Sequence, residues 1–138
     1  MERHQSNALA ICNWLSNHPL VEEVYYPGLP RHPGYEIQKA QTSGNTGIFS
    51  FRLKDARLIP PILRHLKLIA FAESLGGVES LLTYPSVQTH ADIPVEIRNR
   101  IGVDDRLLRY SVGIEHPDDL IADLAQAFDQ AQAEISKL

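Results

Sequence analysis

The chain has 138 residues, 43% of them hydrophobic and 22% charged, so it has the size and composition of one compact domain with a substantial core. Thirteen basic and seventeen acidic residues are scattered along it for a net charge of −4, which argues against nucleic-acid and anionic-membrane binding. No apolar stretch approaches the roughly 20 residues of a spanning helix, and the N-terminus lacks a secretory signal, so we expect a cytoplasmic protein without a membrane partner.

In the first half of the chain the hydrophobic pattern alternates between helical and strand periodicity. It predicts, in chain order, a helix over 2–17, a strand over 21–26, a short helix over 34–41 and a strand over 48–53. The first helix places Cys12, the single cysteine, among apolar neighbours, where a thiol acts as a small apolar group. In the second strand Phe49, Phe51 and Leu53 alternate with polar residues, so we expect one buried face.

The second half of the chain combines short elements with a long closing helix. It predicts, in chain order, a helix over 58–66, strands over 68–72 and 80–84, a short helix over 94–100, a strand over 107–114 and a helix over 117–138. The last strand has an apolar face (Leu108, Tyr110, Val112 and Ile114), while Arg109, Ser111 and Gly113 lie on its other face. Together the elements predict an α+β fold, a small, mostly antiparallel sheet with helices packed on one face.

Arg109 is the first candidate functional residue, because it is the one cation in an otherwise apolar and small-residue strand. A guanidinium offers a planar fork of donors that matches a carboxylate bidentately, which a lysine cannot do. This pattern indicates a binding site for a planar anion. The alternative is a surface arginine, or one paired internally with Asp104, Asp105 or Glu115.

The paired glycines Gly76-Gly77 are the second candidate, because two adjacent glycines allow a tight turn or a close approach of backbone to a ligand. The alternative is an ordinary turn between two strands. His32 and His90 have no second histidine or cysteine at metal-ligand spacing, so we expect loop hydrogen bonds from them and no metal site.

Four motifs follow one another between residues 26 and 115: YPGL at 26–29, SLGGVESL at 74–81, THA at 89–91 and LRYSVGIE at 108–115. In this order they resemble the C-terminal half of the cystathionine synthase and lyase family, the Cys/Met-metabolism group of pyridoxal-phosphate enzymes. The sequence of residues 84–94 looks most similar to that of cystathionine β-lyases and γ-synthases of Gram-positive bacteria. The resemblance implies that residues 1–138 are a single C-terminal domain, like that of fold-type I pyridoxal-phosphate enzymes.

The resemblance also implies roles for individual residues. In such enzymes the arginine at the position of Arg109 binds the α-carboxylate of the amino-acid substrate. A serine at the position of Ser74 lies near the catalytic lysine and the substrate carboxylate, and Leu75 contributes mainly through its backbone. Glu79, Thr89 and His90 are expected to shape the loop rather than to act in catalysis.

Family members attach pyridoxal phosphate to a lysine in a large preceding domain, and this chain has no lysine in a matching context. We therefore expect neither catalytic nor cofactor-binding residues here, and an inactive isolated chain. The expected partners are an N-terminal cofactor-binding domain, a small sulfur amino-acid substrate and further copies in a homo-oligomer. The alternative is a stand-alone amino-acid-binding regulatory or interaction module.

Overall fold

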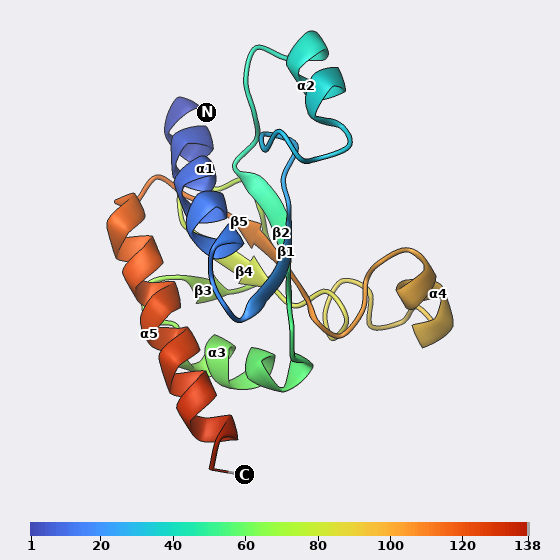
Figure 1. Cartoon of the computed structure of the whole chain (residues 1–138), viewed down its shortest axis with the longest axis vertical. Helices are drawn as coiled ribbons and strands as arrows, with labels where there is room; N and C mark the ends of the chain where they lie inside the picture. Colours follow the sequence, from blue (N-terminus) through green and yellow to red (C-terminus); the bar gives the residue numbers. More distant parts are fainter. Residues whose placement is uncertain (138) are drawn as a thin grey trace.

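Five strands form one sheet, in the spatial order β1-β2-β5-β4-β3 (Figure 1). They are β1 (Val21–Tyr25), β2 (Ile48–Leu53), β3 (Ala70–Phe71), β4 (Leu81–Thr83) and β5 (Leu107–Ser111). All neighbours pair antiparallel except β3 and β4, which are parallel. The computed structural model of the chain describes residues 1–137. The mostly antiparallel sheet predicted from the sequence is confirmed, and β5 is its central strand.

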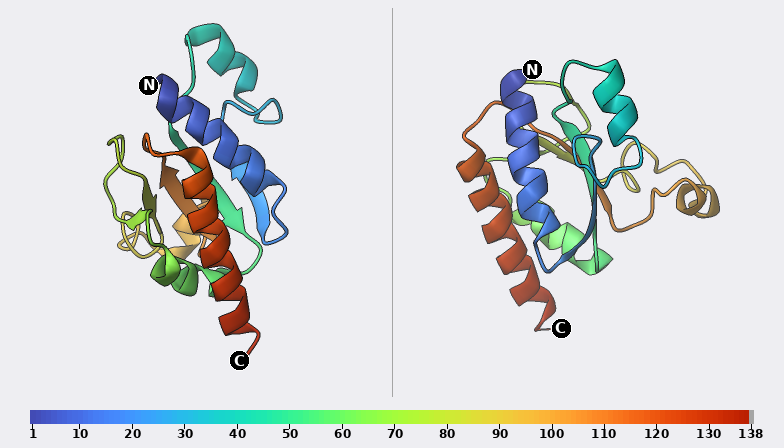
Figure 2. Two further views of the ribbon diagram at one scale, coloured as in Figure 1. Left: turned by 90° about the vertical axis from the view of Figure 1, so that its left-hand side faces the viewer. Right: turned by 45° about the horizontal axis from the view of Figure 1, so that its top comes forward.

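Three helices cover one face of this sheet: α1 (Glu2–Ser16), α3 (Ile59–His65), which continues the short 3-10 turn η1 (Ala56–Leu58), and α5 (Pro117–Ile135). The left view of Figure 2 shows α1 and α5 side by side on that face. The closing helix begins as predicted, with Pro117 in its first turn and Asp118 and Asp119 near its positive end. Leu138, the last residue of its predicted range, lies outside the described residues.

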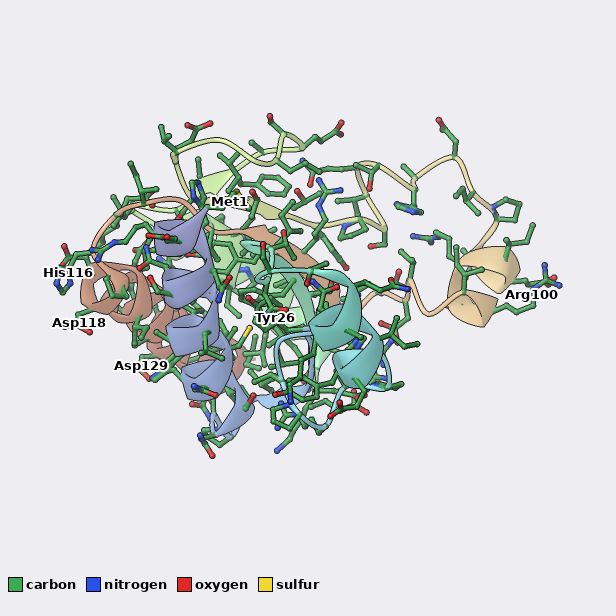
Figure 3. The ribbon with its side chains drawn as sticks, turned by 90° about the horizontal axis from the view of Figure 1, so that it is seen from above. Met1, Tyr26, Arg100, His116, Asp118 and Asp129 are labelled. Atoms are coloured by element: carbon green, nitrogen blue, oxygen red, sulfur yellow. The ribbon has the colours of Figure 1, made fainter. Side chains whose placement is uncertain are left out.

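Two further helices, α2 (Tyr35–Gln41) and α4 (Val95–Arg100), lie on excursions from the sheet. In Figure 3 the α4 segment, which carries Arg100, projects on the side opposite α1 and α5. Both helices are short and begin without a side-chain cap. Neither contributes to the main core, whose helical side comes from α1, α3 and α5.

The core lies between the helices and one face of the sheet. Phe51, Leu108 and Tyr110 are fully buried there, and the rings of Phe49 and Tyr110 are 5.4 Å apart. Each such side chain contributes about 1.5–3 kcal/mol of hydrophobic stabilisation. Cys12 is also fully buried, and burial raises the pKa of its thiol, which confirms its role as a small apolar group.

The predicted alternation along residues 107–114 is wrong at its end, because Ile114 is 47% exposed instead of buried with Leu108 and Tyr110. β5 ends at Ser111, and the Ile114 backbone N–H donates to the carbonyl oxygen of Val78 at 2.8 Å. The chain bonds there to the segment before β4 and leaves the regular ladder, so strand periodicity no longer decides which side chains are buried.

Asp123 on α5 stabilises the backbone that enters β3. Its carboxylate accepts hydrogen bonds from the backbone N–H groups of Lys67, Leu68 and Ile69, each at 2.9 Å, and the residue is 6% exposed.

Asp123→Asn replaces one acceptor oxygen of this carboxylate by a donor. We expect this substitution to lower the free energy of unfolding by about 2–3 kcal/mol in urea titrations. Asp129→Asn, on the exposed side of the same helix, is the control, with an expected change below about 0.5 kcal/mol. Equal losses of unfolding free energy in the two variants would contradict the role of Asp123 in stabilising this backbone segment.

Candidate functional site

Arg109 lies at the middle of the sheet and extends from the face opposite the helices, since its neighbours Leu108 and Tyr110 are buried in the core. Its Nη2 donates to the carbonyl oxygen of Glu73 at 2.7 Å and to Oγ1 of Thr83 at 3.1 Å. Thr83 is directly opposite Arg109 in the β4–β5 register. Two neutral acceptors therefore hold one end of the guanidinium.

None of the carboxylates within residues 1–137 forms an ion pair with Arg109. The three considered as internal partners bind elsewhere: Asp104 to Arg52 and Arg106, Asp105 to Arg98, and Glu115 to Ser80. The alternative of an internally paired arginine is thus wrong. The positive charge of Arg109 is left without a counter-charge from the described part of the chain.

The remaining donors of the Arg109 guanidinium have no acceptor among the described residues. Nε is buried without a hydrogen-bond partner, and no bond from Nη1 is present either. A buried donor without an acceptor costs free energy, which an incoming anion would relieve. Because both hydrogens of Nη2 already have acceptors, the hydrogens free for an incoming carboxylate are those of Nε and Nη1.

The segment 73–80 is fixed beside Arg109 by bonds to β5 and to α1. The Gly76 backbone N–H donates to Oγ of Ser111 at 2.8 Å, and Nε2 of His4 is 3.1 Å from the carbonyl oxygen of Gly77. Gly76 has a φ of 77°, a left-handed conformation that explains the glycine. The paired glycines therefore form an anchored turn, one end of which binds Arg109 through Glu73.

Ser74 and Leu75 directly follow Glu73, whose carbonyl oxygen accepts from Arg109. Both are exposed, and the apolar side chain of Leu75 is 49% exposed. The structure thus brings the start of this turn close to the guanidinium. Neither described side chain forms a hydrogen bond with Arg109, so the roles of Ser74 and Leu75 in binding stay predictions.

A hydrogen-bonded cluster behind the turn was missed by sequence reasoning. The Glu115 carboxylate accepts from the backbone N–H and the hydroxyl of Ser80, at 2.7 and 2.9 Å. The Ser80 hydroxyl in turn accepts from the Gly113 N–H at 2.9 Å, and Nδ2 of Asn7 donates to the Glu115 carbonyl oxygen at 2.8 Å. No spacing signal could have found this cluster, because Ser80 and Glu115 are 35 residues apart.

The two histidines have the loop roles expected of them. Nδ1 of His32 accepts the Gly34 N–H at 3.0 Å, and Nδ1 of His90 lies 2.8 Å from the Thr89 hydroxyl oxygen. Within residues 1–137 there is no group of three or more His, Cys, Asp or Glu residues that could hold a metal ion. None of the helices in this range is long and apolar enough to cross a membrane.

A lysine that forms a Schiff base with a cofactor usually lies in a desolvated pocket that lowers its pKa. All four lysines of this chain (Lys39, Lys54, Lys67 and Lys137) are exposed. Lys39 lies over the ring of Tyr35, 6.0 Å from its centroid, on the peripheral helix α2. The described residues therefore do not fit the attachment of pyridoxal phosphate.

Comparisons with known proteins agree along almost the whole chain. The family model described as "Cys/Met metabolism PLP-dependent enzyme" matches residues 1–129. A cystathionine gamma-lyase of Dictyostelium discoideum is 53% identical over 94% of the chain, and a cystathionine beta-lyase of Lactococcus lactis is 46% identical over 94%. The chain spans only 34% of the length of each of these relatives.

Solved structures give the same result. A cystathionine gamma-lyase from Lactobacillus plantarum, complexed with L-serine, superposes with a TM-score of 0.91 at 42% identity, over 96% of this chain and 35% of that one. A cystathionine gamma synthase from Xanthomonas oryzae pv. oryzae, in complex with aminoacrylate and cysteine, also gives 0.91, at 40% identity and the same coverage of both chains. The similarity therefore extends to the whole fold described above.

Proposed function

The chain belongs to the Cys/Met metabolism PLP-dependent enzyme family, and from this membership we propose that it is the C-terminal, substrate-orienting domain of a cystathionine β-lyase or γ-synthase-like enzyme. The family depends on pyridoxal phosphate. The relatives named above differ in the reaction that their names give, but cystathionine, cysteine and serine are all amino acids with an α-carboxylate. A carboxylate clamp would serve every one of these reactions.

The state of the Arg109 guanidinium is the observation that carries the proposal. It is a half-buried cation with two neutral anchors, a buried donor without a partner and no counter-charge among the described residues. A carboxylate bound there gains charge-assisted hydrogen bonds in a partly desolvated setting, where they are about twice as strong as neutral ones. We assign the α-carboxylate of a small sulfur amino acid to this position.

The contribution of the chain to the reaction is orientation. Arg109 would hold the carboxylate end of the substrate, and Ser74 with the Leu75 backbone would line the adjacent wall. Holding the substrate at one end restricts which bond to its α-carbon faces the reacting groups, and such alignment lowers the barrier by removing rotational freedom before the reaction. Pyridoxal phosphate supplies the electron sink of the reaction when it is bound.

The rest of the assembly follows from the same proposal. We assign the cofactor lysine to an N-terminal domain, because the lysines described above are all exposed. The intact enzyme is proposed to be a cytoplasmic homo-oligomer. The chain by itself would bind neither cofactor nor substrate tightly, since it would supply one wall of a shared site.

The isolated chain is expected to show no visible absorbance band of a bound cofactor after it is mixed with pyridoxal phosphate and passed through a desalting column. Its lysines are exposed, so any adduct should be weak, reversible and spread over several positions. Absorbance spectra and borohydride reduction followed by peptide mapping check this. The full-length enzyme, which should retain the band, is the control.

Two results would count against the assignment. A stable, borohydride-trapped adduct at one lysine of this chain would place the cofactor site here. Saturable calorimetric binding of cystathionine to the isolated chain would instead favour the stand-alone amino-acid-binding module.

A further inference from the structure

Thr83 is a buried residue on the sheet face that carries Arg109. It is 1% exposed and directly opposite Arg109 in the β4–β5 register. Its Oγ1 donates to the carbonyl oxygen of Ala72 at 2.7 Å and accepts from Nη2 of Arg109 at 3.1 Å. One buried hydroxyl thus joins the guanidinium to the backbone just before the turn that contains Ser74.

The direction of these two bonds is determined by the hydrogens that are available. A threonine hydroxyl has one hydrogen, and because Ala72 offers only a carbonyl oxygen, that hydrogen must point to Ala72. The lone pairs of Oγ1 are then left for the guanidinium. Thr83 can therefore act toward Arg109 only as an acceptor, and it cannot compete with Arg109 as a donor to an incoming anion.

The two acceptors of Nη2 together restrict the plane of the guanidinium. The carbonyl oxygen of Glu73 at 2.7 Å and Oγ1 of Thr83 at 3.1 Å bind hydrogens that both lie in that plane. With one acceptor alone, the plane could turn about the Cδ–Nε bond of Arg109. With both, Nε and Nη1 keep one orientation, which is preorganisation for a ligand.

We propose that Thr83 is a positioning residue for the carboxylate clamp: its hydroxyl holds the Arg109 guanidinium in the binding orientation and couples it to the turn that begins at Glu73. This inference rests on the proposed function of Arg109 and adds to it a residue that does not itself touch the substrate. It concerns binding of the carboxylate group, so ligands without a carboxylate should not depend on it.

The test uses the full-length enzyme and two small ligands, L-serine and ethanolamine, which is serine without its carboxylate. Inhibition constants of both against the amino-acid substrate are measured for the wild type, Thr83→Val and Thr83→Ser. Thr83→Val should weaken L-serine about tenfold, the size expected for a lost hydrogen bond to a charged group, and change ethanolamine less than about twofold. It should also raise KM about tenfold with kcat within about twofold, and Thr83→Ser should restore both values.

Equal weakening of L-serine and ethanolamine by Thr83→Val would overturn the proposal, because it would indicate a general structural defect. No weakening of L-serine, or no recovery in Thr83→Ser, would also overturn it. If Thr83→Val does not fold, the inhibition constants of L-serine and ethanolamine are compared in the same way for Thr83→Ala, which adds no group that could clash. Arg109→Ala measured in parallel distinguishes failure of this inference from failure of the proposed function. If Arg109→Ala binds L-serine normally, the proposed function fails. If Arg109→Ala weakens L-serine but Thr83→Val does not, only this inference fails.

Discussion

Arg109→Ala in the full-length enzyme is expected to raise KM for the amino-acid substrate about a hundredfold, because removing one partner of a charged, hydrogen-bonded pair costs about 3 kcal/mol. The cofactor should stay bound, because Arg109 is assigned to the substrate. The cofactor lysine is assigned to the N-terminal domain, since all lysines of this chain are exposed. Steady-state kinetics give the KM, and the visible absorbance of the purified variant gives the cofactor content. Loss of the cofactor band together with activity would show a different role for the residue.

Two control variants make this result specific. Arg109→Lys keeps the charge but loses the planar fork and the double anchorage of Nη2, so it should recover only part of the affinity. Arg64→Ala removes an exposed arginine whose partner is Glu134 on α5, and it should leave KM unchanged. The carboxylate clamp would be ruled out by an Arg109→Ala enzyme with wild-type KM.

Gly113→Ala is expected to cause the largest loss of stability, about 3 kcal/mol or more of the free energy of unfolding. A Cβ at Gly113 would overlap the carbonyl oxygen of Val78 and lie 2.6 Å from the carbonyl carbon of Glu79. Both obstacles are backbone atoms, so they cannot move aside without displacing the turn over 73–80. The variant should therefore also lose substrate affinity, through the displaced Glu73 and Ser74.

Gly34→Ala is the matched control, because the nearest atoms to its new Cβ belong to the side chain of His32, at 3.3 Å. A side chain can shift where a backbone cannot, so the expected loss is below about 1 kcal/mol. Denaturant titrations of the wild type and the two variants provide the comparison. A Gly113→Ala protein as stable as Gly34→Ala would mean that the turn packs loosely on the end of β5.

The regular elements were predictable because their signals are local. Helical spacing in residues 2–17 and the strand alternation of Phe49, Phe51 and Leu53 each follow from a few neighbouring residues, and α1 and β2 confirm them. Prediction was wrong at Ile114, where a backbone bond to Val78 replaces the regular ladder. That bond joins two segments far apart in the sequence, so periodicity contains no trace of it.

The cluster of Glu115, Ser80 and Asn7 illustrates the same limit for polar residues. Each of the three is an ordinary residue type for a surface loop or helix when it is considered alone. Asn7 and Ser80 are nevertheless 1% exposed, because their polar groups satisfy one another and the backbone around Gly113. Burial of this kind depends on three distant segments meeting.

The sequence by itself determined that a single arginine would lie on the polar face of the last strand, because side-chain alternation is a property of the strand alone. It also determined the family, through motifs whose order is preserved along the chain. Only the tertiary structure decided what that arginine binds. Its two anchors, Glu73 and Thr83, are 36 and 26 residues away, and strand pairing in three dimensions brings them to it.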